Sequence, residues 1–476
     1  MKKILPVAVL AALAGVNGAQ AVHVNPDGLG QVLLYPYYST EGDNDTYISL
    51  VNTTSDYKAV KIRILESMNS NEVLDFNIYM SPYDHWSAVI TSAQDEASID
   101  VAGATIRSAD TSCTVPLAVS QGQTIPFRDF VYADDSENGL DRTQEGYVEV
   151  IEMGIITDST LQAAIKHGSY TDADGNPEWR PGDCAYLDAQ WRDGGDWDDD
   201  NDYGMSGVTG GLYGYGVLID VPRGAGAGYD AVALDNWGES IVTSYHTNSG
   251  FVVPTIGSGS SDYAVFDEGG VVEGTASNGW DAVSAILMKG RVYNDYVLEP
   301  SINAGTDWVV TFPTKRQYVN QGTVAEAPFT DAWDDETSTA CESFKIRYWD
   351  REEREPTTPI DPTDFSPLPP PDKPQELSFC AEANVLTFNN SNVLSASART
   401  GYNVDLEDGF NNGWARLDFA AGEGHMLDAG ANTFSGLPAV GFAVQRYLNG
   451  NIMDGVIGNY GIAVNHKADI IVGSSN

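Results

Sequence analysis

The chain has 476 residues, of which 68 are acidic and 25 basic, so its formal net charge at pH 7 is −43. An excess of acidic residues this large argues against a nucleic-acid-binding protein, because contacts with phosphate groups require Lys and Arg. Hydrophobic residues make up 42% of the chain and there are 24 tyrosines, which favours packed structure over disorder.

The first 21 residues have the three parts of a secretory signal peptide. Lys2 and Lys3 are basic, an apolar run extends over 4–16, and Ala19-Gln20-Ala21 is a small-x-small cleavage site. The run is shorter than the roughly 20 residues of a membrane-spanning helix. We therefore expect cleavage after Ala21 and an exported protein in the periplasm, at the cell surface or outside the cell, without membrane insertion.

Residues 22–160 are expected to form an N-terminal β-sandwich region. In the most regular segment Val60, Ile62 and Ile64 share one face, while Lys61 and Arg63 take the other. This period of two is typical of a half-buried strand. Polar turn clusters separate the four β-rich segments 31–35, 46–51, 59–65 and 73–79 at intervals typical of a sandwich.

Residues 161–340 are expected to form a Gly- and Asp-rich β region. Two short helices are predicted. Asp158-Ser159 should cap the first, over 161–166, with Gly168 as its stop. Asp281 should open the second, over 282–289. Further strands are predicted at 146–151, 216–221 and 307–312.

The chain has four cysteines, an even number that predicts two structural disulfides in an exported protein. None has the CxxC spacing of a metal or redox site. Three pairings can be drawn, and proximity in the sequence favours Cys113–Cys184 and Cys341–Cys380.

Residues 341–476 are expected to form a C-terminal β region that contains the proline-rich segment 356–374. A Cys341–Cys380 bond would make that segment a loop tied off at its base rather than a free linker. Residues 344–349 would then lie beside 385–388 within one sheet. The fold class we expect is mainly β, with antiparallel sandwich domains of Ig-like or jelly-roll-like type and one or two short helices.

Acidic loops favour calcium as the cofactor, since carboxylates in a turning loop converge on hard cations. The regular helix-loop-helix pattern fails, because positions six and twelve counted from Asp198 hold Tyr203 and Thr209. An irregular site remains, with a solvated acidic loop as the alternative. The candidate ligands are Asp172, Asp174, Asn176, Asp183, Asp196, Asp198, Asp200 and Asp202.

No HExxH, GxSxG or HxH motif is present, so no catalytic or cofactor-binding residue is assigned. A glycosidase needs only two carboxylates a few ångströms apart, and Glu149 and Glu152 are the pair to inspect first. Their separation by three places them on opposite faces of an ideal strand, which weakens the pair. Aromatic side chains that could stack on sugar rings include Tyr35, Tyr37, Tyr38, Trp86, Trp191, Trp197 and Trp280.

Residues 145–154 (EGYVEVIEMG) and 306–316 (TDWVVTFPTKR) resemble segments of a group of uncharacterised exported proteobacterial proteins, and the stretch from Leu74 to Asp84 is similar to the same group. The resemblance implies export in a Gram-negative setting and transfers no catalytic residue.

Acidity, glycine and tyrosine content and the missing motifs favour a structural or adhesive role, as a surface-layer, matrix or filament subunit that self-associates or contacts other cell-surface components. The alternative is a carbohydrate-binding or carbohydrate-active protein, with polysaccharide as its partner. A third reading is an accessory protein of an outer-membrane system. A concave, aromatic-lined groove with facing carboxylates would favour the carbohydrate function, and exposed strand edges would favour assembly.

Overall fold

The computed structural model describes residues 21–95, 102–129, 132, 139–171, 174–238, 244–267, 269–320, 322–357, 365–366, 377–422 and 424–474. The expected signal peptide, apart from Ala21, and most of the proline-rich segment lie outside these residues. The fold is mainly β, as expected, with five α-helices of nine residues or fewer in the described part of the chain. None of those helices is long and apolar enough to cross a membrane.

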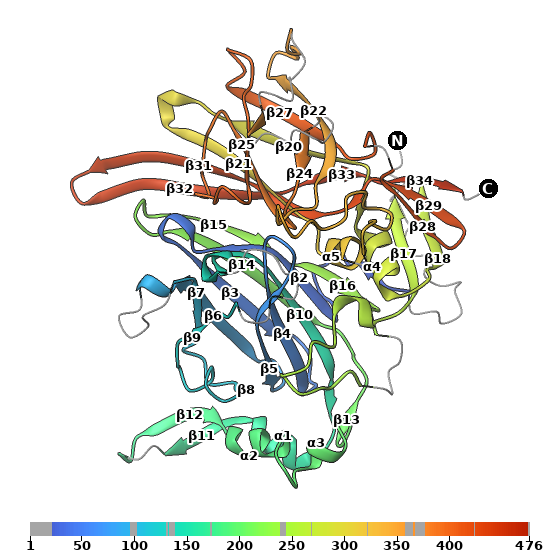
Figure 1. Ribbon diagram of the computed structural model, residues 1–476. Coiled ribbons are helices and arrows are strands. Elements are labelled where there is room, and N and C mark those ends of the chain that lie inside the picture. The colour runs from blue at the N-terminus through green and yellow to red at the C-terminus, as the bar shows by residue number, and fades with distance from the viewer. Residues whose placement is uncertain are drawn as a thin grey trace, which may run out of the picture.

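Two sheets form a first sandwich (Figure 1). Sheet I runs in the order β1 (His23–Val24), β16 (Val232–Asp235), β2 (Val32–Ser39), β10 (Glu145–Ile156), β4 (Lys58–Glu66), β5 (Glu72–Met80) and β8 (Cys113–Val115), with β13 (Met205–Ser206) on β10. Sheet II runs in the order β15 (Ala225–Asp230), β14 (Leu212–Asp220), β3 (Asn44–Asn52), β6 (His85–Ser92), β7 (Ala104–Arg107) and β9 (Ile125–Pro126).

Two further sheets form a second sandwich. Sheet III runs in the order β24 (Leu377–Phe379), β22 (Glu342–Asp350), β27 (Asn412–Asp418), β20 (Arg291–Val297) and β33 (Lys467–Asp469). Sheet IV runs in the order β23 (Phe365–Ser366), β26 (Gly401–Val404), β25 (Ala383–Phe388), β21 (Ala304–Thr311), β31 (Val440–Met453) and β32 (Val456–Asn465). The described ladders are antiparallel except β25 with β26.

Sheet IV joins the two sandwiches because its inner strands β21 and β25 contribute side chains to two separate cores. Val309 and Val385 pack against the interior of the first sandwich, whereas Trp308 and Leu386 face sheet III. Tyr229 of β15 stacks on Phe442 of β31 with 4.4 Å between ring centroids. Such alternation of apolar residues on both sides is typical of a strand buried on both faces.

The strands of the expected middle region are divided between the sandwiches. β13 to β16 pair within sheets I and II, and β20 and β21 pair within sheets III and IV. One expected pairing was wrong. Residues 344–349 belong to β22 and residues 385–388 to β25, which lie in different sheets, and their apolar side chains meet across the second core.

Smaller elements cover the sheets. The helices of the described residues are α1 (Ser159–Ile165), α2 (Cys184–Gln190), α3 (Asp196–Asp199), α4 (Gly279–Leu287) and α5 (Lys315–Val319), with the 3-10 helices η1 (Glu41–Asp43), η2 (Ala93–Asp95), η3 (Leu140–Gln144), η4 (Ile256–Ser258) and η5 (Pro300–Ile302). The remaining strands are β11 (His167–Thr171), β12 (Pro177–Pro181), β17 (Asp262–Asp267), β18 (Gly270–Thr275), β19 (Met288–Lys289), β28 (Met426–Ala429), β29 (Asn432–Ser435), β30 (Leu437–Pro438) and β34 (Ile471–Ser474).

Both predicted helices form, with shifted ends. Asp158 caps α1 by accepting hydrogen bonds from the backbone N–H groups of Thr160 and Leu161 at 2.8 and 3.0 Å. In α4 the cap is Asn278, whose side chain accepts the N–H of Asp281 at 3.0 Å, so the helix begins earlier than expected. It also ends earlier, because Met288 and Lys289 pair with β30.

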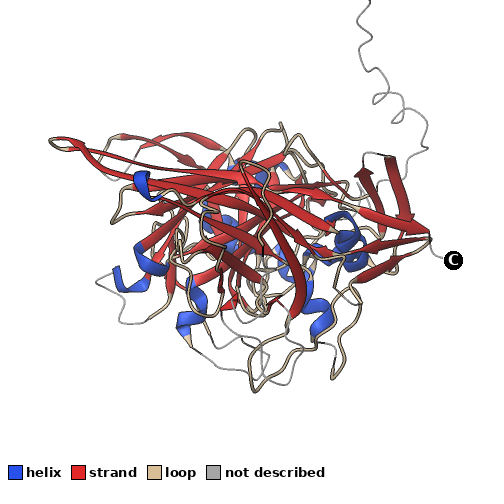
Figure 2. Ribbon diagram, turned by 90° about the horizontal axis from the view of Figure 1, so that it is seen from above, coloured by secondary structure: helices blue, strands red, loops and turns tan. Residues whose placement is uncertain are grey.

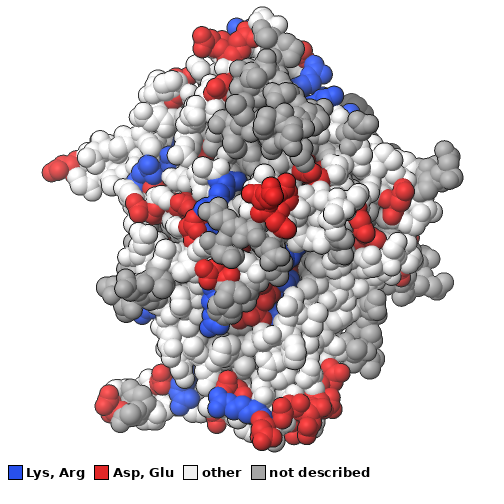
Figure 3. Space-filling view, in the orientation of Figure 1, with Lys and Arg blue, Asp and Glu red and all other residues white. Residues whose placement is uncertain are grey.

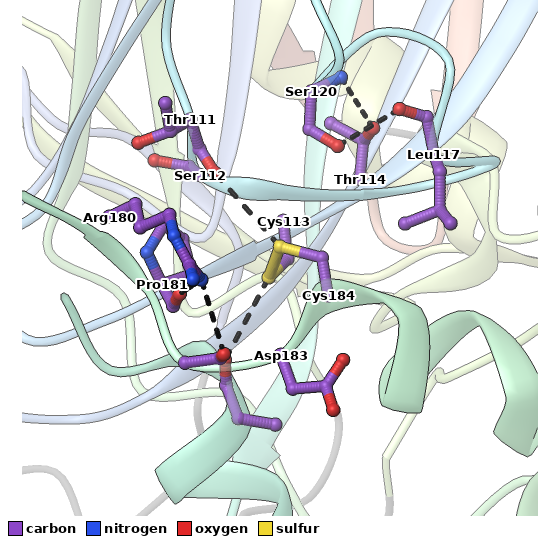
Figure 4. Close-up of a disulfide and its surroundings, with 12 residues drawn as sticks. Thr111, Ser112, Cys113, Thr114, Leu117, Ser120, Arg180, Pro181, Asp183 and Cys184 are labelled. Carbon is purple, nitrogen blue, oxygen red and sulfur yellow. Dashed lines mark hydrogen bonds between the residues drawn. A yellow bond between two sulfur atoms is a disulfide. The ribbon is translucent and has the colours of Figure 1, made fainter. Parts of the chain in front are cut away.

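Both disulfides expected from sequence proximity are confirmed. Cys113–Cys184 fastens α2 to β8 at the edge of sheet I, with Asp183 capping the helix beside it (Figure 4). Cys341–Cys380 joins the residue before β22 to the residue after β24, which closes the chain around the proline-rich segment.

Candidate functional site, a charged cleft on sheet I

The charged face of β4 is buried, although its alternating pattern is that of a strand with one face in solvent. Val60, Ile62 and Ile64 point into the sandwich core as predicted. On the opposite face the Lys61 side chain is 0% exposed and that of Arg63 is 7% exposed. Burying a charge is costly unless it is paired, so the neighbouring strands must supply counter-charges.

Those counter-charges come from the two strands beside β4. Arg63 lies opposite Asp75 of β5 and opposite Glu149 of β10 in the sheet register. Its Nε is 2.7 Å from Glu72 Oε2, and its Nη1 bonds to Glu149. Lys61 Nζ lies 2.7 Å from Asp75 Oδ2. Sheet I therefore carries a row of ion pairs across three strands.

Four residues of this row line the floor of a cleft of about 1110 Å³, namely Arg63, Glu72, Asp75 and Glu149. The opposite wall comes from residues 249–258, from Trp280 at the start of α4, and from residues 313–320 around α5. In Figure 3 acidic and basic side chains lie side by side near the centre of this face, over the part of the fold where Figure 1 labels β4, β5 and β10. The cleft thus lies where the second half of the chain covers sheet I.

The cleft is electrostatically unlike the rest of the protein. Among the residues that the structure describes, its charged lining is three basic and three acidic residues, Arg63, Arg128, Arg316, Glu72, Asp75 and Glu149, whereas the chain has 25 basic and 68 acidic residues. Burial, with the negative charge of Glu72, raises the pKa of Asp75 to about 6. Burial also raises the pKa of Glu149 above its usual range, against the attraction of Arg63. Perturbed carboxyls in a cleft are typical of functional sites.

The lip of the cleft is apolar. Phe251, Val252 and Val253 are 57%, 62% and 50% exposed, and both valines line the cleft. Lys61 Nζ donates a hydrogen bond to the Phe251 carbonyl, which ties this lip to the floor of charged residues. The cleft therefore offers charged groups on its floor and apolar surface at its mouth.

Trp280 is half-buried beside this lip and is held by a close backbone contact. A Cβ at residue 257 would lie 2.3 Å from its indole ring, so Gly257 permits the ring to lie against the chain. The indole consequently has a fixed place in the cleft wall.

A largely buried polar cluster at the border of the cleft joins the two sandwiches. Tyr147 of β10 donates a hydrogen bond to the Pro313 carbonyl at 3.3 Å, and its hydroxyl is 2.7 Å from Ser70 Oγ. Ser70 in turn donates to the Glu382 carboxyl. Burial raises the pKa of Glu382 to about 8, against the positive charge of Lys315. Arg316 also donates a hydrogen bond to the Asn69 carbonyl at 2.5 Å, which adds a further contact between the two sandwiches.

The two acids singled out in the sequence do not form a pair. Glu149 lies in the cleft, whereas Glu152 accepts a hydrogen bond from Lys58 at 2.6 Å and from the N–H of Gly210 at 2.7 Å. Lys58 belongs to the face of β4 that carries Val60, so the two glutamates lie on opposite faces, as their spacing indicated.

The predicted calcium ligands lie far from this cleft in the fold, at the end that carries α1 to α3 (Figure 1). The side chain of Asp183 accepts the N–H of Tyr186, and Asp200 accepts the N–H of Asp202 at 3.1 Å. Asp174, Asn176, Asp196 and Asp198 are exposed, and Asp172 lies outside the described residues.

Among the residues that the structure describes, no three His, Cys, Asp or Glu side chains are grouped to hold a metal ion. Calcium binding stays a prediction. Titration of the chelator-treated protein with Ca²⁺ would check it.

Of the aromatic side chains considered for sugar stacking, Trp280 alone lines the cleft. Tyr35, Tyr37, Tyr38, Trp86 and Trp197 are fully buried, and Trp191 packs against Trp197 and His246. Four charged residues of the cleft were not predicted as site residues from the sequence: Arg63, Glu72, Asp75 and Arg316. The sequence feature that could have indicated them is the charged residues at alternate positions of β4 and on β5.

Comparison with known proteins gives no match: no family model, no curated protein and no solved structure is similar to this chain at a significant level.

Proposed function

We propose that the chain is an exported protein that binds carbohydrate in the cleft on sheet I. The observation that carries this proposal is the combination of paired carboxylates and guanidinium groups on the cleft floor with an indole and an apolar lip on the opposite wall. Two disulfides support export, since disulfides persist in oxidising compartments.

A sugar matches this lining because it is amphipathic. Its hydroxyls both donate and accept hydrogen bonds, so they suit Arg donors next to carboxylate acceptors. Its C–H face packs against aromatic and aliphatic side chains such as Trp280 and Val252. The described lining carries equal numbers of basic and acidic residues, so it also admits acidic sugars, which the strongly acidic remainder of the surface would repel.

Binding is favoured over hydrolysis by the state of the carboxylates. Glu149 is bonded to Arg63, and Asp75 is paired with Lys61. A glycosidase needs one carboxyl that can give up a proton and a second placed to attack or activate water. Ion pairs of this kind instead fix acceptor oxygens in place for hydrogen bonding to a ligand.

A glycan array probed with the purified protein tests the proposal. We expect binding to a restricted set of neutral or uronic-acid oligosaccharides, lost in Trp280→Ala. Trp179→Ala is the matched control, because Trp179 is 69% exposed on β12, outside the cleft. A protein that binds no glycan, or a Trp280→Ala variant that binds like the control, would contradict the proposal.

The structural or adhesive role expected from composition remains a second candidate function. The observation that favours it is the exposed hairpin of β31 and β32, which is separate from the cleft lining.

A further inference from the structure

The hairpin of β31 and β32 extends beyond the body of the protein (Figures 1 and 2). Its outer part exposes an unusual amount of apolar side chain. Exposed fractions between 40% and 64% are found for Ile452, Met453, Ile457, Tyr460, Ile462 and Val464. Contiguous apolar surface of this kind marks interaction sites on soluble proteins.

β32 is also an edge strand. It is the last strand of sheet IV, and β31 is its ladder partner among the described strands. Edge strands are normally protected from pairing by charged residues, proline or strong bulges. Residues 455–465 contain no charged residue and no proline, and the pairing of β32 with β31 is regular from Asn459 to Asn465. This edge is therefore open to another strand.

One face of β32 already packs against β15 and the turn that precedes it. Asn459 donates a hydrogen bond to the Arg223 carbonyl at 2.6 Å, and a Cβ at Gly461 would lie 2.9 Å from the Gly226 carbonyl oxygen of β15. Tyr460, Ile462 and Val464 alternate with these residues and so point the other way. The outward face and the free edge remain for a partner.

The distribution of charge favours a second copy of this chain as the partner. Two copies with a net charge of −43 repel each other over most of their surfaces. Residues 447–465 contain one charged residue, Asp454 near the tip of the hairpin. This neutral stretch is therefore a place where two such acidic molecules can approach closely.

We propose that β32 pairs antiparallel with β32 of a second copy, which joins the two sheets IV into one continuous sheet. An antiparallel pair of identical strands has two-fold symmetry, so the contact closes as a dimer and uses the same residues on both sides. The two rows of Tyr460, Ile462 and Val464 then lie on one face of the joined sheet and cover each other's apolar area. This contact does not depend on the carbohydrate proposal.

Sedimentation velocity of the purified protein tests this dimer. We expect a mass of twice that of the monomer for the wild type and a monomer for the Tyr460→Glu/Ile462→Glu variant, which brings four added negative charges to the interface. Val324→Glu is the control, because Val324 is a 75% exposed apolar residue outside the hairpin. A monomeric wild type, or an assembly that survives in the double variant, would overturn the proposal.

Hydrogen exchange of the wild type gives a second readout that needs no variant. Amides of residues 457–464 should exchange more slowly at high protein concentration than at low concentration, because pairing fills the free edge. A dimer whose β32 amides exchange independently of concentration would place the contact elsewhere and overturn the proposal as well.

Discussion

Arg63 of β4 and Glu149 of β10 face each other across neighbouring strands and form an ion pair in which the side chains are 7% and 1% exposed. Glu72 is a second partner, 2.7 Å from Arg63 Nε. One guanidinium therefore neutralises two carboxylates on the cleft floor. The pairing is asymmetric, because Arg63 keeps a partner when Glu149 is lost, whereas Glu149 loses its counter-charge when Arg63 is lost.

This asymmetry predicts different costs for the two single substitutions. Arg63→Met should lower the free energy of unfolding by about 3–5 kcal/mol, the usual cost of leaving a buried charge unpaired. Glu149→Gln should cost less, and Arg63→Met/Glu149→Gln should recover part of the loss of Arg63→Met. Denaturant unfolding at pH 7 measures all three, and equal costs for the two single variants would contradict the assignment.

Acid should destabilise the protein through His246. Burial lowers the pKa of His246, whose ring contacts Trp191 and Trp197, to about 4. Its unfolded pKa is about 6.5, so the unfolded chain binds more protons between these values and stability falls as the pH drops from about 6.5 to about 4. This one group accounts for a loss on the order of 3 kcal/mol.

His246→Gln removes that contribution and should flatten the dependence of the unfolding free energy on pH over the same window. The slope should not vanish, because burial also lowers the pKa of His466 to about 4. Unfolding followed by tryptophan fluorescence from pH 7 to pH 4.5 makes the comparison. A variant with the wild-type slope would show that His246 is not buried in neutral form.

Glu382 should act in the opposite direction, toward alkaline pH. Its folded pKa of about 8 lies above the unfolded value of about 4.5, so its contribution to stability is complete below about 4.5 and is lost as the pH rises through 8. Glu382→Gln should therefore raise the melting temperature relative to the wild type more at pH 9 than at pH 5. A difference that is the same at both pH values would contradict the buried, protonated carboxyl.

Each disulfide should contribute about 4 kcal/mol, from the entropy of closing loops of 71 and 39 residues. Reductant should lower the melting temperature, and the paired serine variants should assign the effect. Cys113→Ser/Cys184→Ser releases α2 from sheet I, whereas Cys341→Ser/Cys380→Ser loosens the second sandwich. An unchanged melting temperature in reductant would mean that the bonds do not stabilise the fold.

The local pattern of the chain predicted local structure well. The alternation around Ile62 identified the two faces of β4, and Asp158 identified the start of α1. Long-range arrangement was not accessible, since nothing in the residues near β4 shows that a second half of the chain covers its charged face. For the same reason β22 and β25 were expected in one sheet, although they lie in two.

The candidate site could not be predicted for the same reason, because its residues meet through long-range contacts. Glu149 was considered with Glu152, its neighbour in sequence, whereas its partner in the fold is Arg63, 86 residues away. The opposite wall of the cleft comes from Trp280 and Arg316, more than a hundred residues further along the chain. A cleft built from strand register and distant loops has no compact sequence motif.

Isothermal titration of the wild type and Trp280→Ala with one oligosaccharide, the strongest ligand on a glycan array, tests the cleft most directly. We predict saturable binding with one site per chain for the wild type and at least tenfold weaker binding for Trp280→Ala, with both proteins folded at the temperature of the titration. Equal affinity of the two proteins would place the ligand outside the cleft and contradict the account.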